Sequence, residues 1–313
     1  MRYFLGIDGG GTRTTAWLAD ETGKVLARAE AGPSNPLKVG FRAAAREILK
    51  ATRAALREEG FAKAAPRRSR PMILEAVCAG ISGVDRPAVH GPLFKWMRHN
   101  LPARHHLLTS DAAIALAAAV GNSPGIMLIA GTGSIALARD DRGRVLRAGG
   151  WGVPFDDLGS GYDLGRRAVT AALQAFDGRG PRTLLRNRLC RTLDLKEITE
   201  VVSKKLEPQQ IAALAPLVME AARRGDLVAS HLCDRAARDL AELACALLKR
   251  AGWFRRSVPV VCTGGVFRSS PLIQRSFARQ LRRFAPFARI ELLDRPPVEG
   301  ALWLAGKAEG SGQ

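Results

Sequence analysis

The sequence has few cysteines, and their arrangement excludes several kinds of site. The chain of 313 residues has 5 cysteines, an odd number, at positions 78, 190, 233, 245 and 262, without a C-x-x-C pair. Neither the cysteines nor the histidines have a spacing that suits zinc. We therefore expect reduced thiols, most of them inside core strands and helices.

Long apolar runs are also absent. No stretch approaches the ~20 consecutive apolar residues of a membrane-spanning helix. The first β-prone run begins within a few residues of Met1, which leaves no room for a signal peptide. The sequence thus predicts a cytoplasmic protein without a membrane partner. With 47% hydrophobic residues, a chain of this length can form two domains with sizeable cores.

Acidic residues are scarce compared with basic ones. The chain has 29 Asp and Glu against 48 Lys and Arg, a formal net charge of +19. The arginines are spread along the chain and are not interleaved with aromatic residues on one face, so we expect no nucleic-acid partner. The densest run, Arg67-Arg68-Ser69-Arg70, is flanked by prolines and is typical of a solvated loop. An arginine-rich surface that attracts anionic substrates is the favoured interpretation.

Glycine, by contrast, is abundant and marks the first motif. An apolar run, Tyr3–Ile7, ends at Asp8, passes through Gly9-Gly10-Gly11-Thr12 and resumes as a second β-rich run, which predicts strand, turn, strand. Glycines can adopt positive φ and approach a ligand closely, so backbone N–H groups and the Thr12 hydroxyl could face phosphate oxygens. The alternative is a plain hairpin turn. Asp8 argues against it, because a carboxylate inside an apolar run needs a partner.

The opening layout recurs 120 residues later. Gly11 and Thr12 correspond to Gly131 and Thr132, and the strand-turn-strand pattern continues in register on both sides. Two copies of one supersecondary unit imply a duplicated domain.

The rest of the chain alternates between strand and helix patterns. An alanine-rich helix begins at about residue 111, directly after a short strand, and a later strand ends in Gly264-Gly265 before another helix. We expect helices at about 40–60, 88–100, 111–120, 161–175, 180–255 (mainly helical) and 298–307, and strands at 25–29, 73–80, 106–110, 258–263 and 290–293.

These motifs together resemble the sugar kinases of the actin-like ATPase superfamily, and within them the N-acetylglucosamine kinase and glucosamine kinase group of the BadF/BadG/BcrA/BcrD-type ATPases. The Asp8–Thr12 turn resembles the phosphate-1 motif, Ala130–Ser134 the phosphate-2 motif, and Thr263–Val266 the adenosine motif. The resemblance covers nearly the whole chain.

The resemblance implies an α/β protein with a duplicated ribonuclease H-like fold, in which each of two domains has a mixed five-stranded sheet flanked by helices, with a cleft between them. The expected domains are 1–110 with 297–313, and 111–296 with a helical insertion at about 180–255. The cofactors would be ATP and Mg²⁺, the substrate a small amino sugar, and the assembly a homodimer.

Site residues follow from the resemblance position by position. Asp111 matches the carboxylate that accepts the proton of the sugar hydroxyl, although a helix N-cap alone would also explain an Asp there. Asp8 would hold magnesium through water. The implied nucleotide contacts are Gly9, Gly10, Gly11, Thr12, Gly131, Thr132, Gly133, Gly264 and Gly265. The implied sugar contacts are Asn35, Ser82, Gly83, Asp111, Thr132, Gly150, Trp151 and Asp157.

One loop departs from the group's pattern. Where the group has Gly-Asp-Glu-Gly-Ser, this chain has Asp156-Asp157-Leu158-Gly159-Ser160. The loss of one polar group near the sugar leaves the preferred substituent at the 2-position open.

The expected function is an ATP-dependent kinase that phosphorylates the 6-hydroxyl of N-acetylglucosamine or glucosamine. The sequence also leaves N-acetylmannosamine, N-acetylmuramic acid and glucose open. One alternative is an ATPase that activates a reductase, but such activators carry cysteines for an iron-sulfur cluster, and here the thiols fall in core elements. The other is a non-catalytic sugar sensor, which would usually carry a DNA-binding segment before the first strand.

Overall fold

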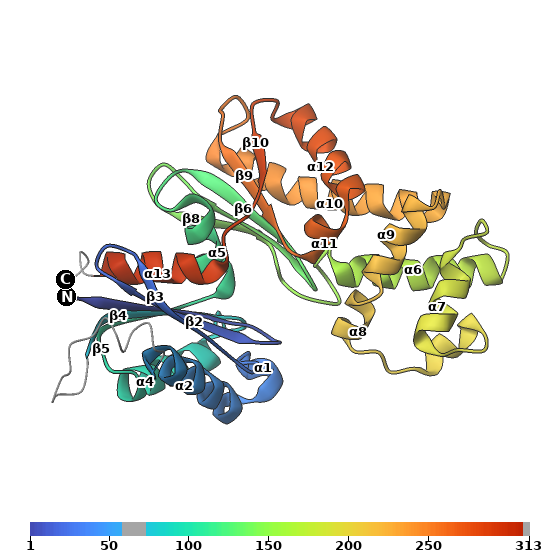
Figure 1. The fold of residues 1–313 in the computed structure, drawn as a ribbon. Helices are drawn as coiled ribbons and strands as arrows, with labels where there is room; N and C mark the ends of the chain where they lie inside the picture. The colour runs from blue at the N-terminus through green and yellow to red at the C-terminus, as the bar shows by residue number, and fades with distance from the viewer. Residues whose placement is uncertain (58–72, 309–313) are drawn as a thin grey trace. The chain divides into compact units, whose positions relative to one another are not determined.

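A computed structural model describes residues 1–57 and 73–308, so the arginine run at 67–70 lies outside the described residues. The chain divides into two compact units (Figure 1). Unit 1 comprises Met1–Asn122 and Asp294–Gln313, and unit 2 comprises Ser123–Leu293. The sequence had put residues 111–122 in the second domain. They belong to unit 1 because the helix at 111–120 packs against the last helix of the chain.

Unit 1 is built on a mixed sheet of 5 strands in the order β3-β2-β1-β4-β5. The first three strands pair antiparallel as a meander, whereas β4 and β5 add in parallel to β1. The carboxyl ends of β1, β4 and β5 therefore meet at one edge of the sheet. The strands are β1 (Tyr3–Gly9), β2 (Thr14–Asp20), β3 (Val25–Ala31), β4 (Leu74–Ile81) and β5 (Ala103–Thr109).

Helices cover both faces of this sheet (Figure 1). On one face, α2 and α4 bury apolar side chains such as Ile48 and Met97 against Leu5 and Ile7. On the other face, α5 and α13 pack near Phe4. The short helix α1 follows β3. The helices are α1 (Pro36–Val39), α2 (Phe41–Arg57), α4 (Pro87–Asn100), α5 (Asp111–Val120) and α13 (Pro297–Lys307).

Unit 2 repeats the sheet in the order β10-β9-β6-β7-β8. Its core lies between one face of the sheet and the helices α6, α10 and α12. The strands are β6 (Gly125–Ala130), β7 (Ser134–Arg139), β8 (Val145–Gly149), β9 (Pro259–Thr263) and β10 (Arg289–Leu292). The helices are α6 (Gly161–Phe176), α7 (Leu185–Leu193), the 3₁₀ helix η1 (Ile198–Ser203), α8 (Pro208–Ala212), α9 (Ala215–Arg223), α10 (Leu227–Ala251), α11 (Gly265–Ser269) and α12 (Pro271–Phe284).

The predicted duplication is confirmed down to single turns. Asp20, the last residue of β2, accepts hydrogen bonds through Oδ1 from the backbone N–H groups of Thr22 and Lys24. Asp140, after β7, accepts the same two bonds from Arg142 and Arg144, with the offset of 120 kept. With matching strand orders, the two units form the duplicated ribonuclease H-like architecture that the resemblance implied.

Two expectations from composition can be compared with the structure. Cys78 and Cys262 lie buried in β4 and β9, and the other three cysteines lie on α7 and α10. Across residues 1–57 and 73–308, no helix combines the length and apolar character needed to cross a bilayer.

Gly300 permits the close contact of α13 with α5. A Cβ at this position would lie 1.9 Å from the backbone oxygen of Ile114. We predict that Gly300→Ala lowers the free energy of unfolding by about 1–3 kcal/mol, or more if the helices cannot separate. Gly306→Ala in the same helix is the control, since its Cβ meets nothing within 4 Å; it should stabilise the helix by about 0.5–1 kcal/mol. Denaturant unfolding measures both, and equal stability of the two variants would contradict this packing role.

Candidate active site

Two carboxylates lie close together in unit 1, where parallel strands end. Asp8 is the last residue but one of β1, and Asp111 is the first residue of α5, two positions after the end of β5. Burial is the main cause that raises the pKa of Asp8 to about 6; the negative charge of Asp111 adds to the rise and Arg13 opposes it. Burial also raises the pKa of Asp111. A carboxylate with a raised pKa accepts a proton more readily, which suits a general base.

The alternative that Asp111 is only a helix N-cap is wrong. Ser110 is the N-cap of α5, and its hydroxyl accepts a hydrogen bond from the Ala113 backbone N–H at 3.2 Å. The Asp111 carboxylate accepts bonds from the Ala112 backbone N–H at 2.9 Å and from the Ser82 hydroxyl. Capping by Ser110 leaves Asp111 available for another role.

The structure brings three predicted sugar contacts to Asp111. Asn35 Nδ2 donates to Ser82 Oγ at 3.4 Å, and Ser82 in turn donates to Asp111. Asn35 is buried, and its Oδ1 caps α1 by accepting from the Leu37 N–H. Gly83 has φ +82°, and a Cβ there would lie 3.0 Å from Asn35 Oδ1. Asn35, Ser82, Gly83 and Asp111 thus form one polar cluster from three separate segments.

The first glycine turn, Gly9–Gly11, needs glycine for a reason other than the predicted one. The prediction of positive φ is wrong here, because Gly9, Gly10 and Gly11 do not have it. What glycine supplies is space: a Cβ at Gly9 would lie 2.4 Å from Ser34 Oγ, and one at Gly11 would lie 2.8 Å from Lys38 Nζ. The Lys38 ammonium is therefore close to this turn. Sequence reasoning missed it, because no motif marks a lysine on so short a helix.

The residues present fit a hard divalent cation. In the part of the chain that the structure describes, the Asp8 carboxylate accepts no hydrogen bond, although it is largely buried and close to a second carboxylate. A buried carboxylate without a hydrogen bond, next to a second carboxylate, favours either a proton or a cation. Mg²⁺ typically uses one or two protein carboxylates and keeps several waters. Asp8 is the residue best placed to hold it.

The second glycine turn, in unit 2, is held by Asp157. The Asp157 carboxylate accepts a hydrogen bond from the Ser134 backbone N–H at 3.1 Å. A Cβ at Gly133 would lie 2.8 Å from the same carboxylate, so a larger residue there would displace the Asp157 side chain. Burial raises the pKa of Asp157, and the bond from Ser134 opposes the rise. The side chain expected to contact sugar thus braces the β6–β7 turn.

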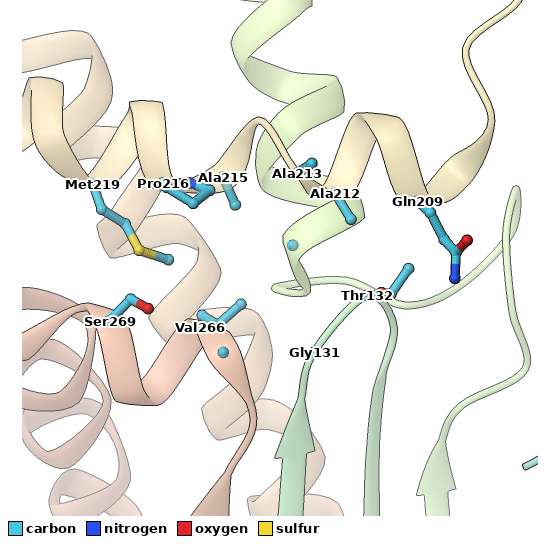
Figure 2. Close-up of a pocket in the computed structure, with 12 residues that line it drawn as sticks. Gly131, Thr132, Gln209, Ala212, Ala213, Ala215, Pro216, Met219, Val266 and Ser269 are labelled. Atoms are coloured by element: carbon cyan, nitrogen blue, oxygen red, sulfur yellow. The ribbon is translucent and has the colours of Figure 1, made fainter. Parts of the chain in front are cut away.

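A cavity of about 390 Å³ adjoins this turn in unit 2 (Figure 2). Thr132 lies at one end of it, and Gln209 on α8 points toward the same end. At Gly264, which follows β9 with φ +101°, a Cβ would lie 2.2 Å from the backbone oxygen of Ala130. The lining residues are Gly131, Thr132, Gly161, Gln209, Ala212, Ala213, Ala215, Pro216, Met219, Gly265, Val266 and Ser269.

The lining of this cavity combines predicted and unpredicted residues. Gly131, Thr132 and Gly265 were predicted as nucleotide contacts, and the structure brings them together. The contribution of α8 and α9 was missed, because their pattern indicates only amphipathic helices. None of the lining residues carries a charge, which suits an uncharged heterocycle and sugar better than phosphates.

The loop with Gly150 and Trp151 lies in unit 2 after β8. Gly150 has φ +75°, and a Cβ there would lie 2.7 Å from the Ile135 side chain. The Trp151 ring is exposed and stacks on the Arg147 guanidinium at 4.4 Å. Arg147 also donates to the carbonyls of Gly149 and Gly150, so a cation and backbone bonds fix this loop.

The cysteines do not favour cluster chemistry. Cys78, Cys233 and Cys262 are 0–1% exposed, and burial raises the pKa of the Cys78 thiol to about 12. Thiolates, rather than thiols, are metal ligands. The described residues give no site where these thiols could meet an iron-sulfur cluster at the surface.

Each unit thus carries a glycine turn at the edge of its sheet, and in unit 2 an uncharged cavity adjoins that turn. The BadF/BadG/BcrA/BcrD ATPase family matches residues 5–282, and the chain belongs to that family. An N-acetylmuramic acid/N-acetylglucosamine kinase of Clostridium acetobutylicum is 31% identical over 309 residues, 97% of this chain and 98% of the relative. An N-acetyl-D-glucosamine kinase of Dictyostelium discoideum is 31% identical over 313 residues, 96% and 97% of the two chains.

Solved structures agree with the fold. The crystal structure of a candidate N-acetylglucosamine kinase from Chromobacterium violaceum matches with a TM-score of 0.80 and 30% identity. The match covers 97% of this chain and 99% of the other. The similarity therefore extends over both units.

The pKa of Asp8 leads to a prediction about stability and pH without divalent cations. Because the folded pKa lies above the ordinary value of 3.8, the native state binds the proton more tightly than the unfolded state, and stability falls as pH rises from about 4 to 6. Asp8→Asn removes this loss. The variant should exceed the wild type in free energy of unfolding above pH 6, by on the order of 2–3 kcal/mol, and the gain should shrink toward pH 4.

Asp20→Asn, on the same sheet, is the matched control. Hydrogen bonds to its carboxylate lower the pKa of Asp20, and the bond from the Thr22 hydroxyl has the largest effect. Its contribution to stability is present above the ordinary pKa and is lost as pH falls, so this variant should be less stable than the wild type near neutral pH. Unfolding in EDTA across pH 4–8 measures both, and a pH-independent effect of Asp8→Asn would refute the assignment.

Proposed function

We propose that this protein is an ATP-dependent hexosamine kinase that transfers the γ-phosphate to the 6-hydroxyl of N-acetylglucosamine or glucosamine. The observation that carries the proposal is the cluster in unit 1, where Asp111 lies with Ser82 and Asn35 beside Asp8. A proton acceptor next to neutral hydrogen-bonding groups is what a sugar hydroxyl needs. The names of the relatives, each a kinase of an N-acetylated amino sugar, support the same substrate class.

In the proposed reaction, Asp111 accepts the proton of the 6-hydroxyl while that oxygen bonds to the γ-phosphorus. The bond between the γ-phosphorus and the oxygen bridging to the β-phosphate breaks, and ADP leaves with that electron pair. Most of the catalysis in such transfers comes from positioning and charge neutralisation. The raised pKa of Asp111 makes it a better acceptor of the hydroxyl proton.

Other residues bind and orient the substrates. Asn35, Ser82 and Gly83 would hold sugar hydroxyls. The resemblance to the sugar kinases also assigns sugar contacts to Gly150, Trp151 and Asp157. The uncharged cavity beside Gly131, Thr132 and Gly265 suits adenosine. The first glycine turn, Gly9–Thr12, and Lys38 close to it suit phosphate oxygens.

Mg²⁺, when bound, neutralises phosphate charge. Asp8 would hold it through water, because Mg²⁺ keeps several waters and uses few protein carboxylates. A cation there would also remove the repulsion between Asp8 and Asp111, which leaves Asp111 free to accept a proton.

The test of the function is a coupled ADP-release assay with Mg·ATP and a panel of sugars. The panel contains N-acetylglucosamine, glucosamine, N-acetylmuramic acid, N-acetylmannosamine, glucose and a blank without sugar. We expect strong stimulation by an amino sugar, and phosphorus NMR of the product identifies the oxygen that carries the phosphate. Release independent of sugar would contradict the proposal.

We predict that Asp111→Ala lowers kcat by about 10²–10⁴-fold, the usual contribution of a general base, and leaves the Kd for Mg·ATP nearly unchanged. Ser110→Ala is the control, because it removes the N-cap of the same helix, at a cost of about 1 kcal/mol in stability, and keeps the base. Steady-state kinetics and calorimetric titration measure both. An Asp111→Ala enzyme with more than about a tenth of wild-type kcat would exclude the role.

A further inference from the structure

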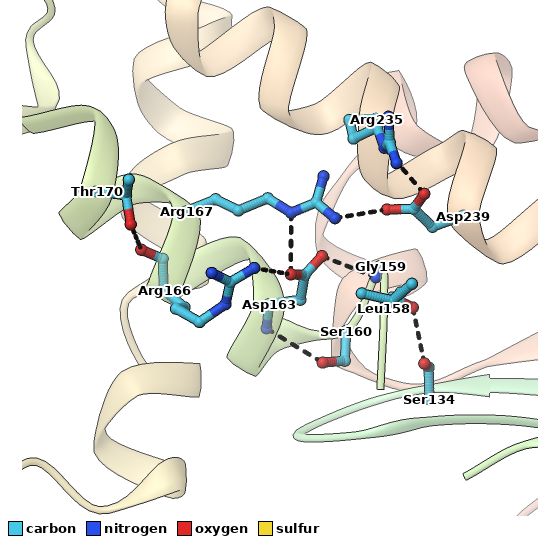
Figure 3. A network of polar contacts seen from close by, with 10 residues as sticks. All are labelled: Ser134, Leu158, Gly159, Ser160, Asp163, Arg166, Arg167, Thr170, Arg235 and Asp239. Carbon is cyan, nitrogen blue, oxygen red and sulfur yellow. Dashed lines mark hydrogen bonds and ion pairs between the residues drawn. The ribbon is translucent and has the colours of Figure 1, made fainter. Parts of the chain in front are cut away.

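A network of charged side chains lies inside unit 2, between α6 and α10 (Figure 3). Asp163 and Asp239 are only 2% and 3% exposed. Arg167 joins them, with Nε 2.9 Å from Asp163 Oδ1 and a terminal nitrogen 2.9 Å from Asp239 Oδ2. A terminal nitrogen of Arg166 also donates to Asp163 Oδ1 at 3.0 Å, and Arg235 Nε donates to Asp239 Oδ1 at 3.0 Å. A single guanidinium therefore bridges two buried carboxylates.

The packing of α6 against α10 does not require this network. The surrounding core is apolar, with Ala168, Ala172 and Leu240 fully buried around α6 and α10. Buried ion pairs rarely stabilise a fold more than apolar side chains of similar size, because the desolvation of each charge costs several kcal/mol. What a carboxylate offers instead is additional lone pairs in fixed directions.

One of those lone pairs holds the loop before α6. Asp163 Oδ2 accepts the backbone N–H of Gly159 at 3.0 Å, while the Asp163 N–H donates to Ser160 Oγ, the N-cap, at 3.2 Å. Gly159 has φ +75°, and a Cβ there would lie 2.7 Å from the Ala236 carbonyl oxygen. The loop therefore lies directly against α10, and Asp163, which Arg167 links to Asp239 on α10, bonds it from α6.

The loop and the start of α6 in turn hold the second glycine turn. Ser134 Oγ donates to the Leu158 carbonyl at 2.8 Å, and the Ser134 N–H donates to Asp157 Oδ1. The N–H groups of Gly161 and Tyr162 donate to the carbonyls of the turn residues Gly131 and Thr132, at 2.8 and 3.1 Å respectively. These four hydrogen bonds connect the segment 157–162 to the segment 131–134, which borders the cavity.

We infer that Asp163, Arg167 and Asp239 are positioning residues for the Gly131–Ser134 turn: the network holds the 157–162 segment against α10, and that segment holds the turn in its ligand-binding shape. The inference rests on the proposed function only in naming Mg·ATP as the ligand. Arginine is required at the centre, because its planar fork reaches two carboxylates at once, whereas a lysine ammonium would hold them less rigidly.

The test compares Asp163→Asn and Arg167→Lys with a matched control, Asp234→Asn. Asp234 also lies on α10 and also accepts hydrogen bonds, from Ser276 Oγ and Arg279, but it does not contact the loop. Hydrogen–deuterium exchange on the full ligand-free chain follows peptides from residues 131–136 and 157–164, with peptides from α12 as an internal reference. Calorimetric titration gives the Kd for Mg·ATP, and the sugar assay gives kcat.

We expect exchange in the two segments to rise about tenfold or more in either network variant, as the loss of one charge-assisted hydrogen bond implies. In the network variants α12 should stay unchanged, and in the control variant, whose bonds are to α12, the two segments should stay unchanged. The Kd for Mg·ATP should rise in the same variants. Arg167→Lys keeps the charge, so it keeps the test open if Asp163→Asn folds poorly.

Exchange that rises evenly across unit 2, α12 included, would identify the network as a general stabiliser and overturn the inference. Unchanged exchange at 131–136 would overturn it too. If the two segments respond and Mg·ATP binding weakens, but no sugar stimulates the wild type, the positioning inference stands while the kinase proposal fails.

Discussion

Two largely buried carboxylates, Asp8 and Asp111, repel one another in unit 1. Neither Asp8 nor Asp111 can ionise there at ordinary cost, because burial and their mutual charge raise the pKa of Asp8 and burial raises that of Asp111. Two carboxylates this close are stable only when a positive charge lies with them, either a proton on one of them or a bound cation. The parallel arrangement of β1, β4 and β5 creates the pair, since it brings their carboxyl ends to one edge.

The duplicated units anchor their glycine turns by the same device. In unit 1 the chain returns after β3, and the N–H groups of Ser34 and Asn35 donate to the Gly10 carbonyl. In unit 2 it returns after β8, and the N–H groups at the start of α6 donate to the turn carbonyls. Each returning segment also carries the N-cap of the next helix, Asn35 for α1 and Ser160 for α6. One ancestral arrangement thus supports both turns, and the two differ in what they add to it.

Sequence reasoning succeeded where a local pattern determines the structure. The repeat at 120 residues predicted two equal sheets, because turn residues such as Asp20 and Asp140 recur in register. The alternative of an N-cap at Asp111 was wrong by one residue: Ser110 caps α5, since both residue types suit an N-cap. Sequence reasoning also misjudged Gly9–Gly11, where the need is space beside Ser34 and Lys38 and not positive φ.

Residues that act across long sequence distances could not be predicted from local pattern. Arg167 and Asp239 are 72 positions apart, and each alone is an ordinary charged residue on an amphipathic helix. The contribution of Gln209 and its neighbours to the cavity depends on where α8 packs. Only tertiary packing reveals such sites, because no short spacing encodes them.

This chain has Asp156 and Leu158 where the kinase group has Gly and Glu. The atoms that hold the loop show how it tolerates this difference. Leu158 contributes its carbonyl to Ser134 Oγ, a bond that any residue could make, and its side chain is 41% exposed. The Asp156 carboxylate accepts the Trp151 backbone N–H at 2.9 Å, which closes the loop on itself. The frame that positions Asp157 therefore does not depend on an acidic side chain at 158. What changes is the one exposed side chain at position 158, which is apolar here, while the hydrogen bonds of Asp157 and of the Leu158 carbonyl to Ser134 are kept.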